Sequence, residues 1–230
     1  MKELWEREAR DWAAWVREPG HDSYWQFSPR FFELVPPPGR RTLDLACGEG
    51  RLARDLAARG HAVVGIDASS TLVELAREAD PDGEYVVGDA AALPFEDASF
   101  DLVVAYNALM DVGDMAGAVR EAARVLEPGG RFCISVVHPL GYVGEFGGEE
   151  PDAPFVFSSP YFERRELHDV FERDGLRMTL HSVVRPLADY TRALEDAGFR
   201  LEALGEPAFR GDDVQLRRVP HFLHLRAVKP

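Results

Sequence analysis

One short segment combines an acid with very small residues at the point where an apolar run ends and a helical pattern begins. In LDLACGEG, the residues of interest are Asp44, Ala46, Gly48 and Gly50. Small residues let the backbone approach a ligand closely, and a carboxylate accepts hydrogen bonds or faces a positive charge. The segment therefore predicts a binding site for a nucleotide-like ligand at the start of a helix.

The glycine loop by itself leaves two cofactors open. Gly48-x-Gly50-x-x-Ala53 fits the G-x-G-x-x-G/A fingerprint of dinucleotide-binding proteins, and Asp67 follows at a distance suited to a ribose diol. However, the Glu49 carboxylate would repel a pyrophosphate and compete for the same amides, and the fingerprint calls for no acid at Asp44. S-adenosylmethionine carries a ribose, an adenine, an ammonium and a sulfonium but no phosphate, so these acids favour it.

Two further strand ends supply the rest of the predicted ligand site. Gly88-Asp89-Ala90 ends the third predicted strand, where Asp89 can accept from the adenine amino group and the Ala90 amide can reach a ring nitrogen. Tyr106 ends the fourth strand, beside the expected place of the methionine part. We expect these residues to lie together, because open α/β sheets bind ligands at the carboxyl ends of their strands.

The elements that must position these residues alternate between strands and helices. Apolar segments predict five strands, at 42–46, 61–67, 84–88, 100–106 and 131–137. Helical patterns lie between them, and a last helix over LADYTRALEDAGF precedes two segments that predict a closing antiparallel pair. The predicted fold is α/β, with a Rossmann-like, doubly wound, seven-stranded sheet. The sheet is mostly parallel with an antiparallel last strand, and a small insertion follows the fifth strand.

The same pattern divides the chain into four segments. Residues 1–38 predict an N-terminal helical lid, 39–137 the cofactor-binding core, 138–185 a substrate-covering insertion, and 186–230 the completion of the core. The insertion predicts a loop over 138–160 and then a hairpin around Asp174-Gly175. Aromatic residues of the lid and the insertion would roof an apolar pocket, or else form small cores of their own.

Four motifs in order carry a resemblance to a known family. They are LDLACGEG, VVGIDAS, VVGDAAALPFEDASFDLVVAYNAL and VREAARVLEPGGRFCISVVHP. The segment 42–137 thereby resembles the class I S-adenosylmethionine-dependent methyltransferases, in particular the methyltransferase type 11 group. The resemblance implies that the protein is a methyltransferase that uses S-adenosyl-L-methionine. Ala46 departs from the family pattern, which usually has glycine there.

The resemblance also implies a role for each matching residue. Asp44 would orient the loop and interact with the methionine ammonium, while Ala46, Gly48 and Gly50 would line the methionine and the ribose. Asp67 and Ala68 would contact the ribose, and Asp89 and Ala90 would contact the adenine. The Tyr106 carbonyl would accept from the ammonium.

Three further residues are candidates for the transfer step and for closing the site. A base is useful if the methyl acceptor is a hydroxyl or an acidic carbon, and histidine is poised for this near neutral pH. His138 directly follows the fifth strand and His181 lies on the hairpin, so we expect both to face the cleft. Tyr24, in the lid, would close over the methionine end, or would simply pack in a core.

The composition of the chain limits the kinds of molecule that it is expected to bind. The chain has 40 acidic and 26 basic residues and a net charge of −14, which disfavours DNA and RNA. No apolar run is long enough to span a membrane. Cys47 and Cys133 lie in no Cys/His cluster, which predicts a reducing, cytoplasmic setting and no metal site. We therefore expect a monomer or homodimer that methylates a small organic molecule of aromatic or polyketide-like character.

Alternative functions stay open on the sequence. One is a protein that binds the cofactor without catalysis, and another is an NAD(P)-dependent oxidoreductase. A third keeps methyl transfer but replaces the small acceptor by RNA or protein, of which the acidic composition disfavours RNA.

Overall fold

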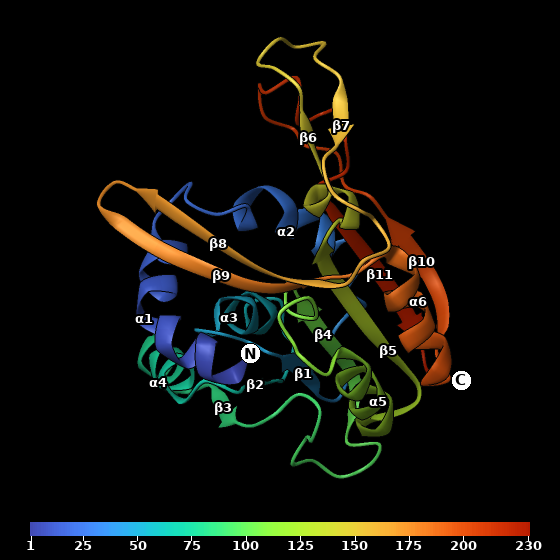
Figure 1. Cartoon of the computed structure of the whole chain (residues 1–230). Helices are drawn as coiled ribbons and strands as arrows, with labels where there is room; N and C mark the ends of the chain where they lie inside the picture. Colours follow the sequence, from blue (N-terminus) through green and yellow to red (C-terminus); the bar gives the residue numbers. More distant parts are fainter.

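The computed structural model describes all residues, 1–230, and is built around one seven-stranded sheet (Figure 1). The strands lie in the spatial order β3 (Glu84–Val87), β2 (Val63–Asp67), β1 (Thr42–Leu45), β4 (Phe100–Tyr106), β5 (Leu126–Val137), β11 (Phe222–Val228), β10 (Arg200–Gly205). β11 pairs antiparallel with both of its neighbours, while β1 to β5 pair in parallel. The predicted fold class is confirmed, including the antiparallel last strand.

Helices cover both faces of this sheet, because side chains alternate along each strand. On one face, α5 (Met115–Val125) and α6 (Leu187–Asp196) pack on Val103 and Ala105 of β4. On the other face, α2 (Tyr24–Phe32) and α3 (Arg51–Ala57) pack on Leu102 and Val104. α4 (Ser70–Ala79) lies beside α3 on that second face.

The first helix does not pack on the sheet. α1 (Lys2–Arg17) lies between α4 and the hairpin formed by β8 (Arg165–Arg173) and β9 (Leu176–Val184) (Figure 1). Glu6 docks α1 on the N-terminus of α4, where its carboxylate accepts from the hydroxyls of Ser69, at 2.5 Å, and Thr71, at 2.8 Å. α1 and the hairpin therefore form a cover above the carboxyl edge of the sheet.

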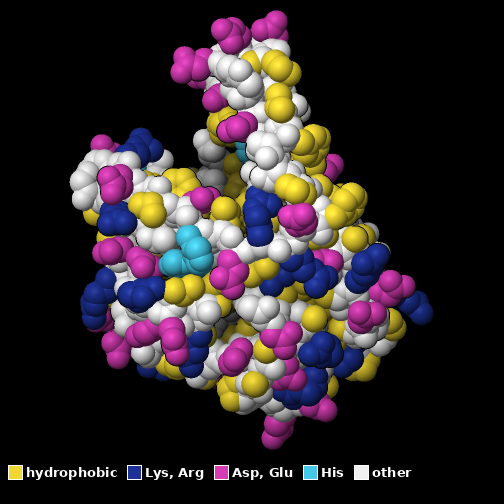
Figure 2. Space-filling model, viewed as in Figure 1, with side chains coloured by type: hydrophobic (Ala, Val, Ile, Leu, Met, Phe, Trp, Pro, Cys, Tyr) yellow, Lys and Arg dark blue, Asp and Glu magenta, His cyan; other side chains and the backbone are white.

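The segment predicted as loop, 138–160, is more ordered than expected. It contains a 3-10 helix, η1 (Pro139–Tyr142), and a two-stranded ladder of β6 (Gly144–Phe146) and β7 (Phe155–Phe157). The Phe146 and Phe155 rings meet edge to face, with centroids 5.3 Å apart. Figure 2 shows the resulting arm standing away from the rest of the molecule. Such short strands escape sequence analysis because cross-strand ring pairs leave no periodic signal.

Two side chains from the segment before β11 support this arm. Gln215 donates to the carbonyl of Gly148, and Arg218 donates to that of Ala153 and lies over the Phe146 ring. No helix of the structure has the length and apolar character needed to cross a membrane.

Candidate functional site

A cavity of about 710 Å³ lies at the carboxyl edge of the sheet. One wall is formed by strand ends and the glycine loop, and the facing wall by α1 and the hairpin. All but one of the predicted cofactor-binding residues line it: Asp44, Ala46, Gly48, Asp67, Ala68, Asp89, Ala90, Tyr106 and Tyr24. Gly50 is the exception, since it lies behind the loop against Tyr85.

The glycine loop follows β1 and takes an unusual backbone path. Ala46, Gly48 and Gly50 all have positive φ, of 58°, 57° and 80°. A Cβ atom on Gly48 would lie 2.8 Å from the Trp12 ring, and one on Gly50 would lie 2.9 Å from Tyr85. Both glycines are thus required by conformation and by space. Ala46 adopts the same region at a cost of about 1–2 kcal/mol, which explains why glycine suits this position.

Asp67 holds the glycine loop against the next loop. Its Oδ2 accepts from the Gly48 amide at 2.9 Å, and its Oδ1 accepts from the Ser69 amide at 2.9 Å. Burial raises the pKa of the Asp67 carboxyl, although the amides that bond to it act in the opposite direction. A carboxylate has about four acceptor sites, so Asp67 retains acceptor capacity on the cavity side.

Asp44 lies buried beneath the loop with an unused acceptor. Its residue exposure is 1%, and Oδ2 has no hydrogen-bond partner. Burial, reinforced by the nearby Asp67 carboxylate, raises the pKa of Asp44 to about 8. A buried, unpaired carboxyl group is unfavourable unless a positive charge joins it. The residues present therefore fit a ligand with an ammonium group at this point of the cavity.

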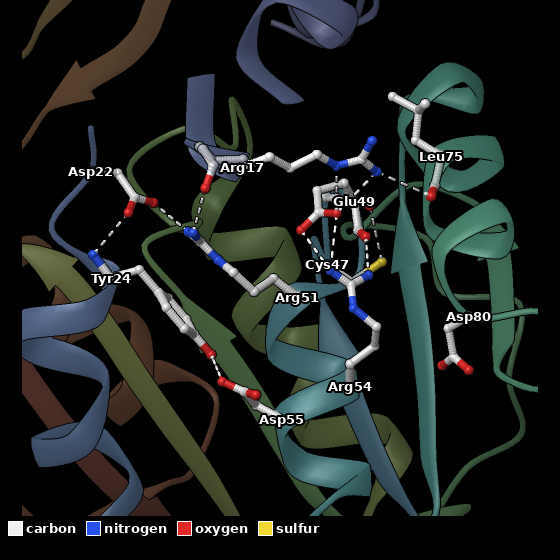
Figure 3. Close-up of polar contacts among 12 residues, drawn as sticks. Arg17, Asp22, Tyr24, Cys47, Glu49, Arg51, Arg54, Asp55, Leu75 and Asp80 are labelled. Carbon is white, nitrogen blue, oxygen red and sulfur yellow. Dashed lines mark hydrogen bonds and ion pairs between the residues drawn. The ribbon is translucent and has the colours of Figure 1, made fainter. Parts of the chain in front are cut away.

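Glu49 corrects one sequence argument. Its carboxylate is buried and lies 3.0 Å from the Arg54 guanidinium and 3.2 Å from that of Arg17 (Figure 3). The two arginines neutralise the charge, and the side chain does not occupy the amides of the loop. The expectation that an uncompensated Glu49 carboxylate repels a pyrophosphate is therefore wrong. The preference for a phosphate-free ligand rests on Asp44 instead.

Arg51 links the N-terminal helices to the glycine loop, a role that sequence analysis missed. This first residue of α3 donates to the Val16 carbonyl at 2.8 Å, forms an ion pair with Asp22, and lies 3.9 Å from the centroid of the Tyr24 ring. The Tyr24 hydroxyl donates to Asp55 at 2.6 Å (Figure 3). The ring of Tyr24 therefore forms part of the cavity wall, while its hydroxyl is bonded to Asp55 of α3.

The remaining predicted cofactor residues sit at the ends of β3 and β4. Asp89 is exposed, and its Oδ1 accepts from the Ala91 amide at 2.8 Å. Ala90 beside it is buried. Tyr106 has a buried hydroxyl without a partner, and its ring packs between those of Tyr24 and Phe31.

Neither predicted catalytic histidine lines the cavity. His138 accepts from the Leu140 amide through Nδ1, and its Nε2 lies 3.0 Å from Glu206. His181 lies 2.7 Å from His168, between their Nδ1 atoms. Its neighbours in β9, Met178, Leu180 and Ser182, line the cavity, and strand alternation turns His181 the other way. The geometry gives no support to either histidine as a base.

The facing wall carries polar residues that sequence analysis also missed. Asp111 follows β4, Asp169 lies on β8 and Ser182 on β9, and all three line the cavity. For Asp169, the sequence did contain a signal. Alternate residues of a strand share a face, and Asp169 lies between Leu167 and Phe171 on an otherwise apolar face of β8.

The segment that contains the glycine loop and the ends of β1 to β4 is similar to segments of known proteins. Residues 43–134 match a family model described as a methyltransferase domain. A demethylmenaquinone methyltransferase of Beutenbergia cavernae is 42% identical over 98 residues, which cover 43% of this chain and 41% of the relative. One of Corynebacterium kroppenstedtii is 37% identical over 115 residues, 50% of this chain and 49% of the relative. The chain thus spans half or less of the length of these relatives.

A solved structure extends the likeness to nearly the whole chain. The S-adenosylmethionine-dependent methyltransferase of Mesorhizobium loti is 25% identical, with a TM-score of 0.71, and the match covers 90% of this chain and 98% of that one. Residues 43–134 of this chain are therefore similar to methyltransferase domains, and the chain shares its fold with an S-adenosylmethionine-dependent methyltransferase of known structure.

Proposed function

We propose that this protein transfers a methyl group from S-adenosylmethionine to a small organic molecule. The observation that carries the proposal is the buried Asp44 carboxyl, whose Oδ2 has no hydrogen-bond partner, at the glycine loop in a cavity that Asp67 and Asp89 also line. An ammonium group would favour the ionised form of Asp44, whereas a phosphate would oppose it. When bound, S-adenosylmethionine supplies an electrophilic methyl group on a positively charged sulfur.

Each strand-end acid has a distinct task in this proposal. Asp44 would pair with the methionine ammonium, which favours the ionised form of a carboxyl that is otherwise held neutral. Asp67, already fixed by two amides, would accept from the ribose hydroxyls. Asp89 would accept from the adenine amino group through the oxygen that the Ala91 amide does not use.

The cover over the cavity would serve the acceptor. Trp5, Trp12 and Trp15 of α1 line the cavity, as do Leu167 and Leu180 of the hairpin. Apolar walls with a few polar groups are typical of small-molecule sites. The chain's contribution to the reaction would then be to align acceptor and methyl group and to exclude water, without a histidine base.

Two further observations support the proposed setting and acceptor class. Cys47 and Cys133 are both free and buried, which agrees with the cytoplasm. The two relatives described above are named for methylation of demethylmenaquinone, a small molecule. Their matches reach only about half of each chain, so the acceptor of this protein is a separate question.

A label-transfer experiment tests the proposal. The protein would be incubated with S-adenosylmethionine labelled in its methyl group and with a small-molecule extract, an RNA pool and a protein pool in turn. We expect label in the small-molecule fraction, lost in Asp44→Asn but kept in Asp82→Asn, which removes an exposed acid of the same type. Label in RNA or protein alone would contradict the acceptor class, and cofactor binding without any transfer would favour a non-catalytic binding protein.

A further inference from the structure

We infer that the wall facing the glycine loop binds a protonated amino group of the methyl acceptor, through the carboxylates of Asp111 and Asp169. The inference rests on the proposed function and names the substrate class that this cavity would select. It concerns where the acceptor is held, and leaves open which of its atoms receives the methyl group.

Asp111 is fixed at this wall by contacts with the hairpin. The Ser182 hydroxyl donates to Asp111 Oδ1 at 2.6 Å, and the Val183 amide donates to the Met110 carbonyl at 2.8 Å. The segment after β4 is therefore tied to the base of the hairpin by a side-chain and a backbone hydrogen bond. A carboxylate held in this way presents its second oxygen at a defined place.

Arg185 is a cation whose charge acts on Asp111, but its donors are used elsewhere. It is buried, and Nη1 donates to the Met110 carbonyl while Nη2 donates to the Val112 carbonyl at 2.9 Å. It forms no salt bridge with Asp111, although its charge lowers the pKa of that carboxyl. Arg185 is thus a positioning residue that shapes the segment after β4 and leaves Asp111 without a paired counter-charge.

Asp169 brings a second carboxylate to the same region. It lies on the cavity face of β8, diagonally across the hairpin from Ser182, and its side chain forms no hydrogen bond or salt bridge. Tyr142 also lines the cavity, and burial above all, followed by the nearby Asp111 carboxylate, raises the pKa of its hydroxyl. Two carboxylates, a hydroxyl and a phenol therefore form one polar patch in this wall.

The charges of the cavity decide what this patch can bind. Its basic side chains are those of Lys2, which is exposed, Arg51, which is paired with Asp22, and His21, which lies 3.0 Å from Asp174. Met1, which carries the α-amino group of the chain, also lines the cavity. Burial raises the pKa of the Asp111 carboxyl to about 8, despite the Ser182 hydroxyl and Arg185. A cation reverses this penalty by favouring the ionised form, whereas an anion would add repulsion.

The neighbouring residues define the rest of the acceptor. Phe171, Met178 and Leu180 lie on the same face of the hairpin as Asp169 and Ser182. An apolar surface beside a pair of unpaired acids fits an amine with an aromatic or aliphatic body. A neutral alcohol of the same shape would keep the apolar contact and lose the charge pair.

Three probes of matched shape test this inference: phenethylamine, 2-phenylethanol and 3-phenylpropanoate. Binding would be followed by quenching of the cavity tryptophans, with and without S-adenosylhomocysteine. We expect the amine to bind about tenfold to a hundredfold more tightly than the alcohol, the range for a hydrogen bond to a charged group. The carboxylate should bind most weakly.

Variants assign the preference to the two acids. Asp111→Asn and Asp169→Asn should each reduce the preference for the amine and leave the alcohol unchanged, while Asp82→Asn should change neither. Thermal unfolding of each variant establishes that it is folded. Equal binding of amine and alcohol, no binding of the amine, or a preference that survives both substitutions would overturn the inference. Failure of S-adenosylhomocysteine to bind would instead contradict the proposed function, since the amine preference is measured without it as well.

Discussion

Replacing Asp44 by asparagine should stabilise the ligand-free protein while it weakens cofactor binding. The carboxyl is buried, and its pKa is raised from 3.8 to about 8. Between these pH values the folded protein holds a proton that the unfolded chain has released, so stability falls as pH rises through this window. Asparagine has nearly the same shape and does not ionise, so it removes this dependence.

The size of the effect follows from the shift. A pH of 7 lies about 3 units above the pKa of this carboxyl in the unfolded chain, and each unit corresponds to about 1.36 kcal/mol. At pH 7 the Asp44→Asn variant should therefore be more stable than the native protein by on the order of 4 kcal/mol. At pH 4 it should nearly vanish. A charge-assisted hydrogen bond to the cofactor ammonium contributes about 1.5–3 kcal/mol, so the variant should bind S-adenosylmethionine about tenfold to a hundredfold more weakly.

Urea unfolding of the ligand-free protein at pH 4 and pH 7, with calorimetric titration of S-adenosylmethionine, measures both effects. Asp82→Asn, which removes an exposed charge, is the control and should change neither. A variant that is less stable than the native protein at pH 7, or one that binds the cofactor as tightly, would refute the assignment of Asp44.

Three further predictions concern the loop and the lid. Asp67→Ala should lower the free energy of unfolding by about 2–4 kcal/mol, because two buried amides lose their acceptor, and it should abolish cofactor binding. Urea unfolding measures the stability and calorimetry the binding, and unchanged stability would contradict the bridging role of Asp67. Ala46→Gly should stabilise the protein by about 0.5 kcal/mol, since relief of the positive φ outweighs the added chain entropy; a loss of stability in urea would count against this strain. Glu6→Gln should lower the melting temperature at pH 7. The folded pKa of Glu6 is lowered to about 2 from 4.5, so its contribution is present above pH 4.5, and the difference between variant and native should shrink as pH falls toward 2; a constant difference would contradict it.

The sheet and its ligand-binding edge could be predicted because both depend on local patterns. Apolar segments with turn residues between them identified every strand of the main sheet, and the acids Asp44, Asp67 and Asp89 came directly after or near strand ends. The Asp174-Gly175 turn likewise predicted the hairpin, and both residues have the positive φ that such a turn requires.

What could not be predicted depends on contacts between distant segments. Glu49 was read as a free charge, and only the fold brings Arg17 to it from the first helix. His181 was expected in the cavity, but the register of the hairpin turns Ser182 inward in its place. The Asp111 site is formed by two segments far apart in the sequence, and no local pattern announces it.

Calorimetric titration of S-adenosylmethionine and of NAD⁺ into the native protein tests the central claim most directly. We predict saturable binding of S-adenosylmethionine at one site per chain, weakened about tenfold to a hundredfold in Asp44→Asn, and no measurable binding of NAD⁺. Tight binding of NAD⁺ without binding of S-adenosylmethionine would contradict the account.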